Sequence, residues 1–165
     1  MTRDEQFMRL ALEQAKLARE HGDFPFGAVV TWRGELLIEC ENAESQQADV
    51  TAHAEMMAIR QACLKLERRD LSDCEIYSST EPCPMCSAAI FQSNIKRVVF
   101  GLYRDDLPHI FRRRKIRISE LASDWDYEPE VIGGVLRDEA LPPFEGLKLP
   151  LRVVPKYHSS QSRED

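Results

Sequence analysis

The sequence predicts an α/β domain built in layers, because helical and strand patterns alternate along most of its 165 residues. Segments with apolar residues at helical spacing lie between short apolar runs bounded by turn residues. Helices that cross over between neighbouring strands make those strands parallel. A chain of this length fits one domain with its own core, so we predict one domain over residues 1–158 and a frayed polar tail over 159–165.

The first predicted elements are a helix and a β-hairpin. Residues 4–20 place apolar side chains near helical spacing among charged neighbours, and His21 and Gly22 supply a stop. Residues 27–32 and 36–40 are short apolar runs on either side of a tight turn. We therefore expect two strands joined directly to each other.

Two helix and strand pairs are predicted to follow. Residues 42–50 are polar and irregular, and a helix with one apolar face is expected from residue 51 or 52 to about 66. A strand at 74–78 leads to a second helix at about 85–93 and an apolar strand at 97–101. The order is helix, hairpin, helix, strand, helix, strand.

The last third of the chain has weaker patterns. Residues 104–118 are basic with scattered apolar side chains, and residues 131–136 are compatible with a strand or with the start of a helix. Pro142 and Pro143 break the segment that follows. We predict no architecture for this part beyond these elements.

Composition restricts the classes of function. The formal net charge of −6 disfavours broad, sequence-independent binding of nucleic acid, which depends on Lys and Arg neutralising phosphates. No run approaches the roughly 18 apolar residues of a membrane helix, and the first residues lack the apolar core of a signal peptide. The five cysteines are an odd number, so a disulfide framework is not expected. We expect a cytoplasmic protein without a membrane partner.

Three candidate metal ligands and one glutamate lie at two predicted helix starts. His53 precedes Glu55 by two residues, and Cys83 and Cys86 form a C-x-x-C motif whose sulfurs fall on one face of a helix. One His and two Cys satisfy the three protein ligands of a catalytic zinc site, in which the fourth position is kept for water. We predict one Zn²⁺ per subunit, held by His53, Cys83 and Cys86.

Glu55 is predicted to be the catalytic acid and base. It is close enough to face a water on the metal without being a ligand. It can take the proton of that water and pass it to the ring and to the departing ammonia. The joint pattern H-x-E followed by P-C-x-x-C is typical of zinc nucleobase deaminases.

Each part of this pattern has an ordinary explanation when it stands alone. A histidine at a helix start is more often a capping residue than a ligand, and a C-x-x-C motif can be a redox pair or half of a structural zinc site. A structural site would need a fourth Cys or His, and Cys63 and Cys74 are better placed as core residues. The combined pattern therefore favours the catalytic interpretation.

The sequence resembles the cytidine deaminase superfamily from about Phe7 to Gly101, within the branch of guanine, tRNA adenosine and fungal-type cytosine deaminases. The resemblance is carried by Phe24-Pro25-Phe26-Gly27-Ala28-Val29-Val30, Asn42, Thr51-Ala52-His53-Ala54-Glu55, Ala58-Ile59-Arg60, Glu81-Pro82-Cys83-Pro84-Met85-Cys86 and Ala88-Ala89-Ile90.

This resemblance implies a three-layer α/β/α fold with a central mixed five-stranded sheet. It also implies a homodimer or larger assembly whose neighbouring subunit helps close the pocket. Asn42 matches the family's asparagine that hydrogen-bonds the substrate base or sugar. Phe26 and Ala54 are the other expected substrate contacts, although Phe26 can equally be a core residue.

The substrate that we predict is a free nucleobase or small nucleoside, most of all a purine, as in the guanine deaminase branch. One alternative is tRNA adenosine deamination, because the basic run at 112–117 could follow a phosphate backbone. A solvated helix or strand face is the favoured explanation of that run, because the rest of the protein is acidic. Cytosine or cytidine deamination is a further alternative, and a non-catalytic binding module stabilised by zinc is the alternative from another class.

Overall fold

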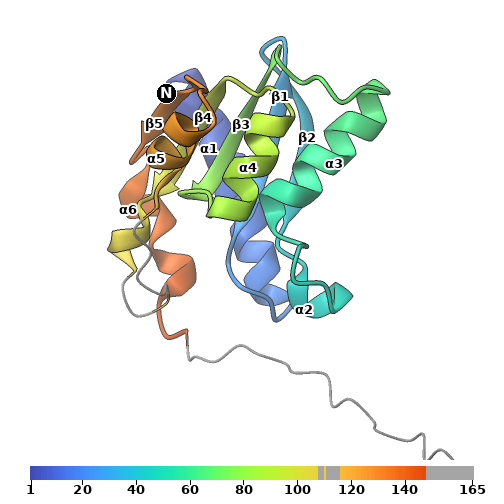
Figure 1. Ribbon diagram of the computed structural model, residues 1–165. Helices are drawn as coiled ribbons and strands as arrows, with labels where there is room; N and C mark the ends of the chain where they lie inside the picture. Colours follow the sequence, from blue (N-terminus) through green and yellow to red (C-terminus); the bar gives the residue numbers. More distant parts are fainter. Residues whose placement is uncertain (108–109, 111–115, 148–165) are drawn as a thin grey trace, which may run out of the picture.

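The computed structural model describes residues 1–107, 110 and 116–147, and Figure 1 shows the arrangement of their helices and strands. The predicted tail at 159–165 and most of the basic run at 112–117 lie outside the described residues. Within the part that is described, no helix is both long and apolar enough to cross a membrane.

A five-stranded sheet forms the centre of the molecule. Its strands, in chain order, are β1 (Gly27–Trp32), β2 (Glu35–Glu41), β3 (Cys74–Thr80), β4 (Arg97–Leu102) and β5 (Glu130–Gly133). Their order across the sheet is β2-β1-β3-β4-β5. Strand β1 is antiparallel to both of its neighbours, whereas β3, β4 and β5 are parallel. The mixed five-stranded sheet predicted from the sequence is confirmed.

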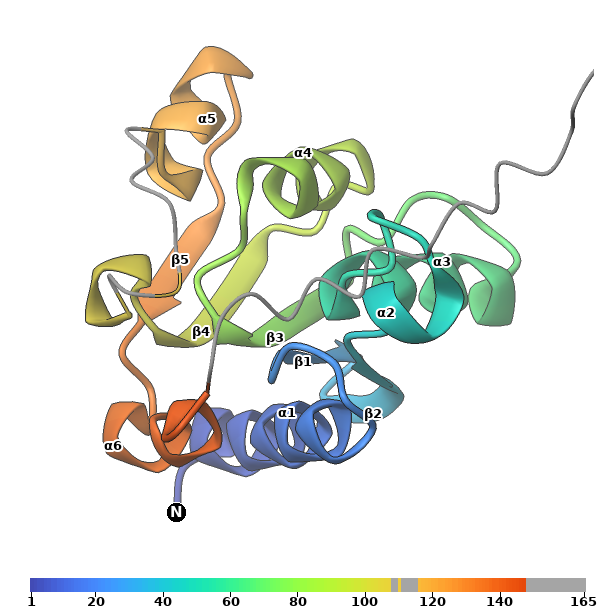
Figure 2. The same cartoon turned by 90° about the horizontal axis from the view of Figure 1, so that it is seen from below.

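One face of the sheet is covered by α1 (Arg3–Glu20) and the short α6 (Arg137–Ala140) (Figure 2). Helix α1 begins at a capping box in which Thr2 and Glu5 satisfy each other's backbone N–H groups. Its apolar face packs against Val29, Tyr77 and Val99, which neighbour one another across β1, β3 and β4. This packing fixes α1 across the middle of the sheet.

The opposite face is covered by α3 (Ala54–Leu66), α4 (Pro84–Gln92) and α5 (Ile118–Asp124) (Figure 2). The residues adjacent to these three in the central strands point to this side, because successive side chains of a strand alternate between faces. Val30, Ile76 and Val98 accordingly belong to the core beneath these helices. The result is the predicted α/β/α arrangement, with α3 and α4 on the same side of the sheet.

Several short elements were not predicted from the sequence. Residues 42–50 were expected to be irregular, but they contain the one-turn helix α2 (Glu44–Gln47). The buried carboxylate of Asp23 accepts hydrogen bonds from the backbone N–H groups of Ser45 and Gln46, which follow it by 22 and 23 residues, and so caps this turn from a remote loop. The 3-10 turns η1 (Arg104–Asp106) and η2 (Pro142–Phe144) complete the described elements.

Candidate active site

The three predicted metal ligands and Glu55 meet where α3 and α4 begin. His53 is the N-cap residue of α3, and its carbonyl oxygen accepts from the N–H of Met57. Cys83 is the N-cap residue of α4, and its carbonyl oxygen accepts from the N–H of Ser87. Both helix N-termini therefore face the cluster, and the partial positive charge at a helix start favours thiolate sulfur.

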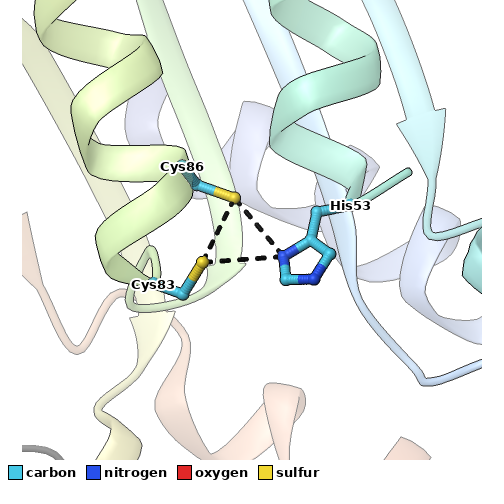
Figure 3. A group of neighbouring side chains, drawn as sticks. All are labelled: His53, Cys83 and Cys86. Carbon is cyan, nitrogen blue, oxygen red and sulfur yellow. Dashed lines mark hydrogen bonds between the residues drawn. The ribbon is translucent and has the colours of Figure 1, made fainter. Parts of the chain in front are cut away.

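The donor atoms of His53, Cys83 and Cys86 converge (Figure 3). Nδ1 of His53 lies 3.6 Å from Sγ of Cys83 and 3.4 Å from Sγ of Cys86, and the two sulfurs are 3.6 Å apart. A tetrahedral zinc ion with ordinary Zn–S and Zn–N bonds separates its ligand atoms by about 3.5–3.8 Å. The donor types and their spacing thus fit zinc, and the three donor atoms all lie within 4.8 Å of one another.

The electrostatics of the cluster favour a bound cation. The hydrogen bond with Cys86 lowers the pKa of Cys83 to about 4, despite burial. Burial acts to lower the pKa of His53, but hydrogen bonds with Cys83 and Glu44 raise it to about 10. The site therefore holds a thiolate that needs a positive charge beside it, and a zinc ion supplies that charge when the imidazole is neutral.

Glu44 lies behind His53, on the side away from the sulfurs. Its Oε1 is 3.6 Å from Nε2 of His53. Metal-binding histidines commonly present their second ring nitrogen to a carboxylate, which fixes the ring orientation and the tautomer. Glu44 also contacts Asn42, whose amide nitrogen donates to it at 3.2 Å and to Asp23 at 2.7 Å.

Glu55 lies in the first turn of α3 and is buried. Ser78 Oγ is 3.1 Å from Glu55 Oε1 and 2.7 Å from the carbonyl oxygen of Thr80, so β3 fixes the orientation of the carboxyl group. Burial raises the pKa of Glu55, which moves it toward the neutral pH at which a shuttling acid and base works best.

A cavity of about 120 Å³ opens at these residues. Its lining is formed by Phe26, His53, Glu55, Thr80, Glu81, Cys83 and Arg104. Of the predicted substrate contacts, Phe26 lines this cavity. Ala54 is buried as the first residue of α3, and Asn42 is fully buried beside Asp23 and Glu44; neither is among the described lining residues. Their roles remain predictions.

Three charged residues of the site were not predicted from the sequence: Glu44, Glu81 and Arg104. Glu81 directly precedes the Pro82-Cys83 pair and stood inside a quoted motif, so its position carried a signal. Glu44 and Arg104 had none, since each reaches the site through the folding of distant segments.

Comparison with known proteins places this architecture in a family. Residues 1–102, more than half of the chain, match the cytidine and deoxycytidylate deaminase zinc-binding region. The chain belongs to the cytidine and deoxycytidylate deaminase family. The match spans the first four strands and includes His53, Glu55, Cys83 and Cys86.

Curated relatives of this deaminase have different named substrates. The tRNA-specific adenosine deaminase of Aquifex aeolicus is 44% identical over 97 residues, covering 59% of this chain and 64% of that protein. The probable cytosine deaminase of Schizosaccharomyces pombe is 33% identical over 150 residues, covering 87% of this chain and 91% of that protein.

Solved structures of family members share the fold. The structure of guanine deaminase from Nitrosomonas europaea superposes with a TM-score of 0.75 and 28% identity, covering 84% of this chain and 81% of that one. The chain is therefore a zinc-dependent deaminase, a hydrolase that acts on C–N bonds, with a zinc site that His53, Cys83 and Cys86 are positioned to form.

Proposed function

We propose that this deaminase hydrolyses the exocyclic amine of a free nucleobase or small nucleoside, with a purine as its preferred substrate. The observation that carries the proposal is the small cavity that brings Glu55 and the His53, Cys83 and Cys86 cluster to one place. A preference for a purine is supported by the similarity to a guanine deaminase structure over most of the chain.

The residues of the site have distinct roles in this proposal. His53, Cys83 and Cys86 hold a zinc ion, which when bound activates a water for attack on the carbon that bears the amine. Glu55 would take one proton from the water and deliver it to the ring nitrogen, and would then take the proton of the newly added hydroxyl group and deliver it to the amine, which leaves as ammonia. Ser78 orients Glu55, Glu44 orients His53, and Phe26 supplies an apolar wall for the ring.

A second candidate function is deamination of adenosine in tRNA, which several relatives carry in their names. The described part of the basic run does not favour it. Arg117 is 23% exposed and pairs with Glu81 at 2.7 Å and with Asp105 at 2.5 Å, so its charge is already neutralised. The net charge of −6 also opposes the approach of a polyanion.

Ammonia release from a panel of substrates tests the proposal. The panel contains guanine, adenine, cytosine, their nucleosides, a pterin and a tRNA transcript, each assayed at 50 and 200 mM salt. We expect turnover of at least one free base or nucleoside, with a rate that changes less than about twofold between the two salt concentrations.

Binding to tRNA through six or more phosphates loses on the order of a thousandfold in affinity over that salt range. Turnover of the transcript alone, with such a salt dependence, would contradict the proposal in favour of tRNA editing. Zinc-loaded protein that releases ammonia from no member of the panel would instead support a non-catalytic binding module. The homodimer and the cytoplasmic location expected from the sequence stay predictions.

A further inference from the structure

Two charged residues in the cavity wall take no part in the hydrolysis described above. Glu81 follows the end of β3, and Arg104 follows the end of β4 by two residues. They are 5% and 7% exposed, and both line the cavity. Ligands of open α/β sheets bind outside the carboxyl ends of parallel strands, which is where these two residues lie.

Glu81 holds the backbone of Arg104 in place. Oε2 of Glu81 accepts from the backbone N–H of Arg104 at 3.2 Å and from Nη1 of Arg117 at 2.7 Å. The backbone N–H of Glu81 donates to the carbonyl oxygen of Leu102 at 2.8 Å, which continues the pairing of the two strands. A buried and hydrogen-bonded carboxylate thus fixes the chain segment that carries Arg104 at the cavity.

The chemistry of Arg104 restricts what the cavity binds. A guanidinium group carries five N–H donors, has no acceptor and stays charged at all physiological pH values. With five donors, such a group in a pocket wall can donate to a ligand that offers oxygen or nitrogen acceptors in addition to its protein contacts. Thr80 lines the same cavity, and its buried hydroxyl oxygen has no hydrogen-bond partner in the described part of the structure, so it can serve a ligand as well.

A ring carbonyl is the acceptor that distinguishes the candidate bases. Guanine and cytosine carry an exocyclic amine at one carbon and a carbonyl oxygen at another, so the amine can face Glu55 while the carbonyl faces a donor elsewhere in the wall. In guanine, the carbonyl oxygen O6 and the ring nitrogen N7 form a pair of acceptors that the arginine fork matches well. Adenine has no carbonyl oxygen.

We propose that Arg104 is a specificity-determining residue that hydrogen-bonds the ring carbonyl of the substrate, so that the enzyme acts on amino-oxo heterocycles rather than on adenine. This inference rests on the proposed function of the same site. The contact of Arg104 with the substrate is separate from zinc binding and from proton transfer by Glu55.

Matched pairs of substrates test the role of Arg104. Guanine is compared with 2-aminopurine, which keeps the amine and lacks the carbonyl, and cytosine is compared with 4-aminopyrimidine for the same reason. The ratio of kcat/KM within each pair is measured for the wild type, Arg104→Gln and Arg104→Lys. Because both substrates meet the same preparation, a loss of folded or zinc-loaded protein cancels from the ratio.

We expect the wild type to prefer the carbonyl-bearing member of a pair by at least about tenfold, the scale of a hydrogen bond to a charged group. Arg104→Gln should reduce this preference about tenfold, and Arg104→Lys, which keeps the charge and loses the fork, should lie between. The matched control is Arg137→Gln. Arg137 lies in α6, is 47% exposed and pairs with Asp106 of η1, the turn that also contains Arg104. Its ratio should equal that of the wild type.

Two failures can be told apart. If the wild type is active but Arg104→Gln leaves the ratio unchanged, or if adenine is the better substrate, the role of Arg104 is overturned and the proposed deamination of a free base stands. If the zinc-loaded wild type releases ammonia from neither pair and from none of the other free bases, the proposed function itself is overturned, and this inference falls with it.

Discussion

At the scale of residues, the site depends on three side chains that are close in space and come from two separate segments of the chain. Spacing alone predicted that Cys83 and Cys86 share a helix face, and their sulfurs do lie 3.6 Å apart. The combined motif predicted that these cysteines would meet His53, which precedes Cys83 by 30 residues. Glu44 could not be found in this way, because it reaches His53 through a helical turn that is capped from a remote loop.

Loss of one ligand should remove the metal. We expect His53→Ala and Cys86→Ala to lose at least about nine-tenths of the bound zinc after dialysis, because two remaining ligands cannot complete a tetrahedral site. Zinc content by elemental analysis is the measurement, with a melting curve to verify the fold. Cys63→Ala is the control, since Cys63 is a partly buried cysteine outside the cluster. Equal zinc content in all four proteins would contradict the assignment.

At the scale of elements, hydrophobic periodicity and turn residues predicted α1, the hairpin, α3, β3, α4 and β4 to within a few residues. The predictions of α3 and α4 mattered most, because both helices start at the site. Strand β5 was left open between strand and helix, and α5 and α6 were not predicted. These segments are short, and their positions depend on contacts such as Phe91 with Tyr127, which sequence periodicity does not report.

An ion pair that joins α1 to β4 gives the fold a predictable pH dependence. Arg97 donates to both carboxylate oxygens of Asp4 at 2.8 and 3.0 Å, and this hydrogen bonding lowers the pKa of Asp4 below its usual 3.8. A lowered folded-state pKa stabilises the protein above the unfolded-state value, and the stabilisation is lost as the pH falls through the folded-state value.

We therefore expect Asp4→Asn to lower the free energy of unfolding by about 1 kcal/mol at pH 7, the upper range for a partly exposed pair. The difference from the wild type should shrink as the pH falls below 3.8, the usual pKa of an aspartate. Denaturant unfolding at several pH values measures it, and Asp124→Asn, an exposed position at the end of α5, serves as the control. A penalty that stayed constant or grew as the pH fell would show that the ion pair is not its source.

At the scale of the whole molecule, the sequence predicted a layered α/β fold and the location of its zinc site. It did not predict the cavity wall that selects the substrate. That wall combines residues from the ends of parallel strands, and Arg104 comes from the segment after β4 where sequence patterns weaken. The sequence also did not show that Arg117 of the basic run pairs with Glu81 at the cavity.

In the proposed mechanism, Glu55 moves protons for a zinc-dependent hydrolysis of a base amine. The most direct test of this role is ammonia release by the wild type and by Glu55→Gln, measured at equal zinc content on the best free-base substrate. Glutamine keeps the shape of the side chain and cannot accept the proton, so we expect the rate to fall at least about a hundredfold while zinc and fold are retained. A Glu55→Gln protein that kept both its zinc and its rate of ammonia release would contradict the mechanism.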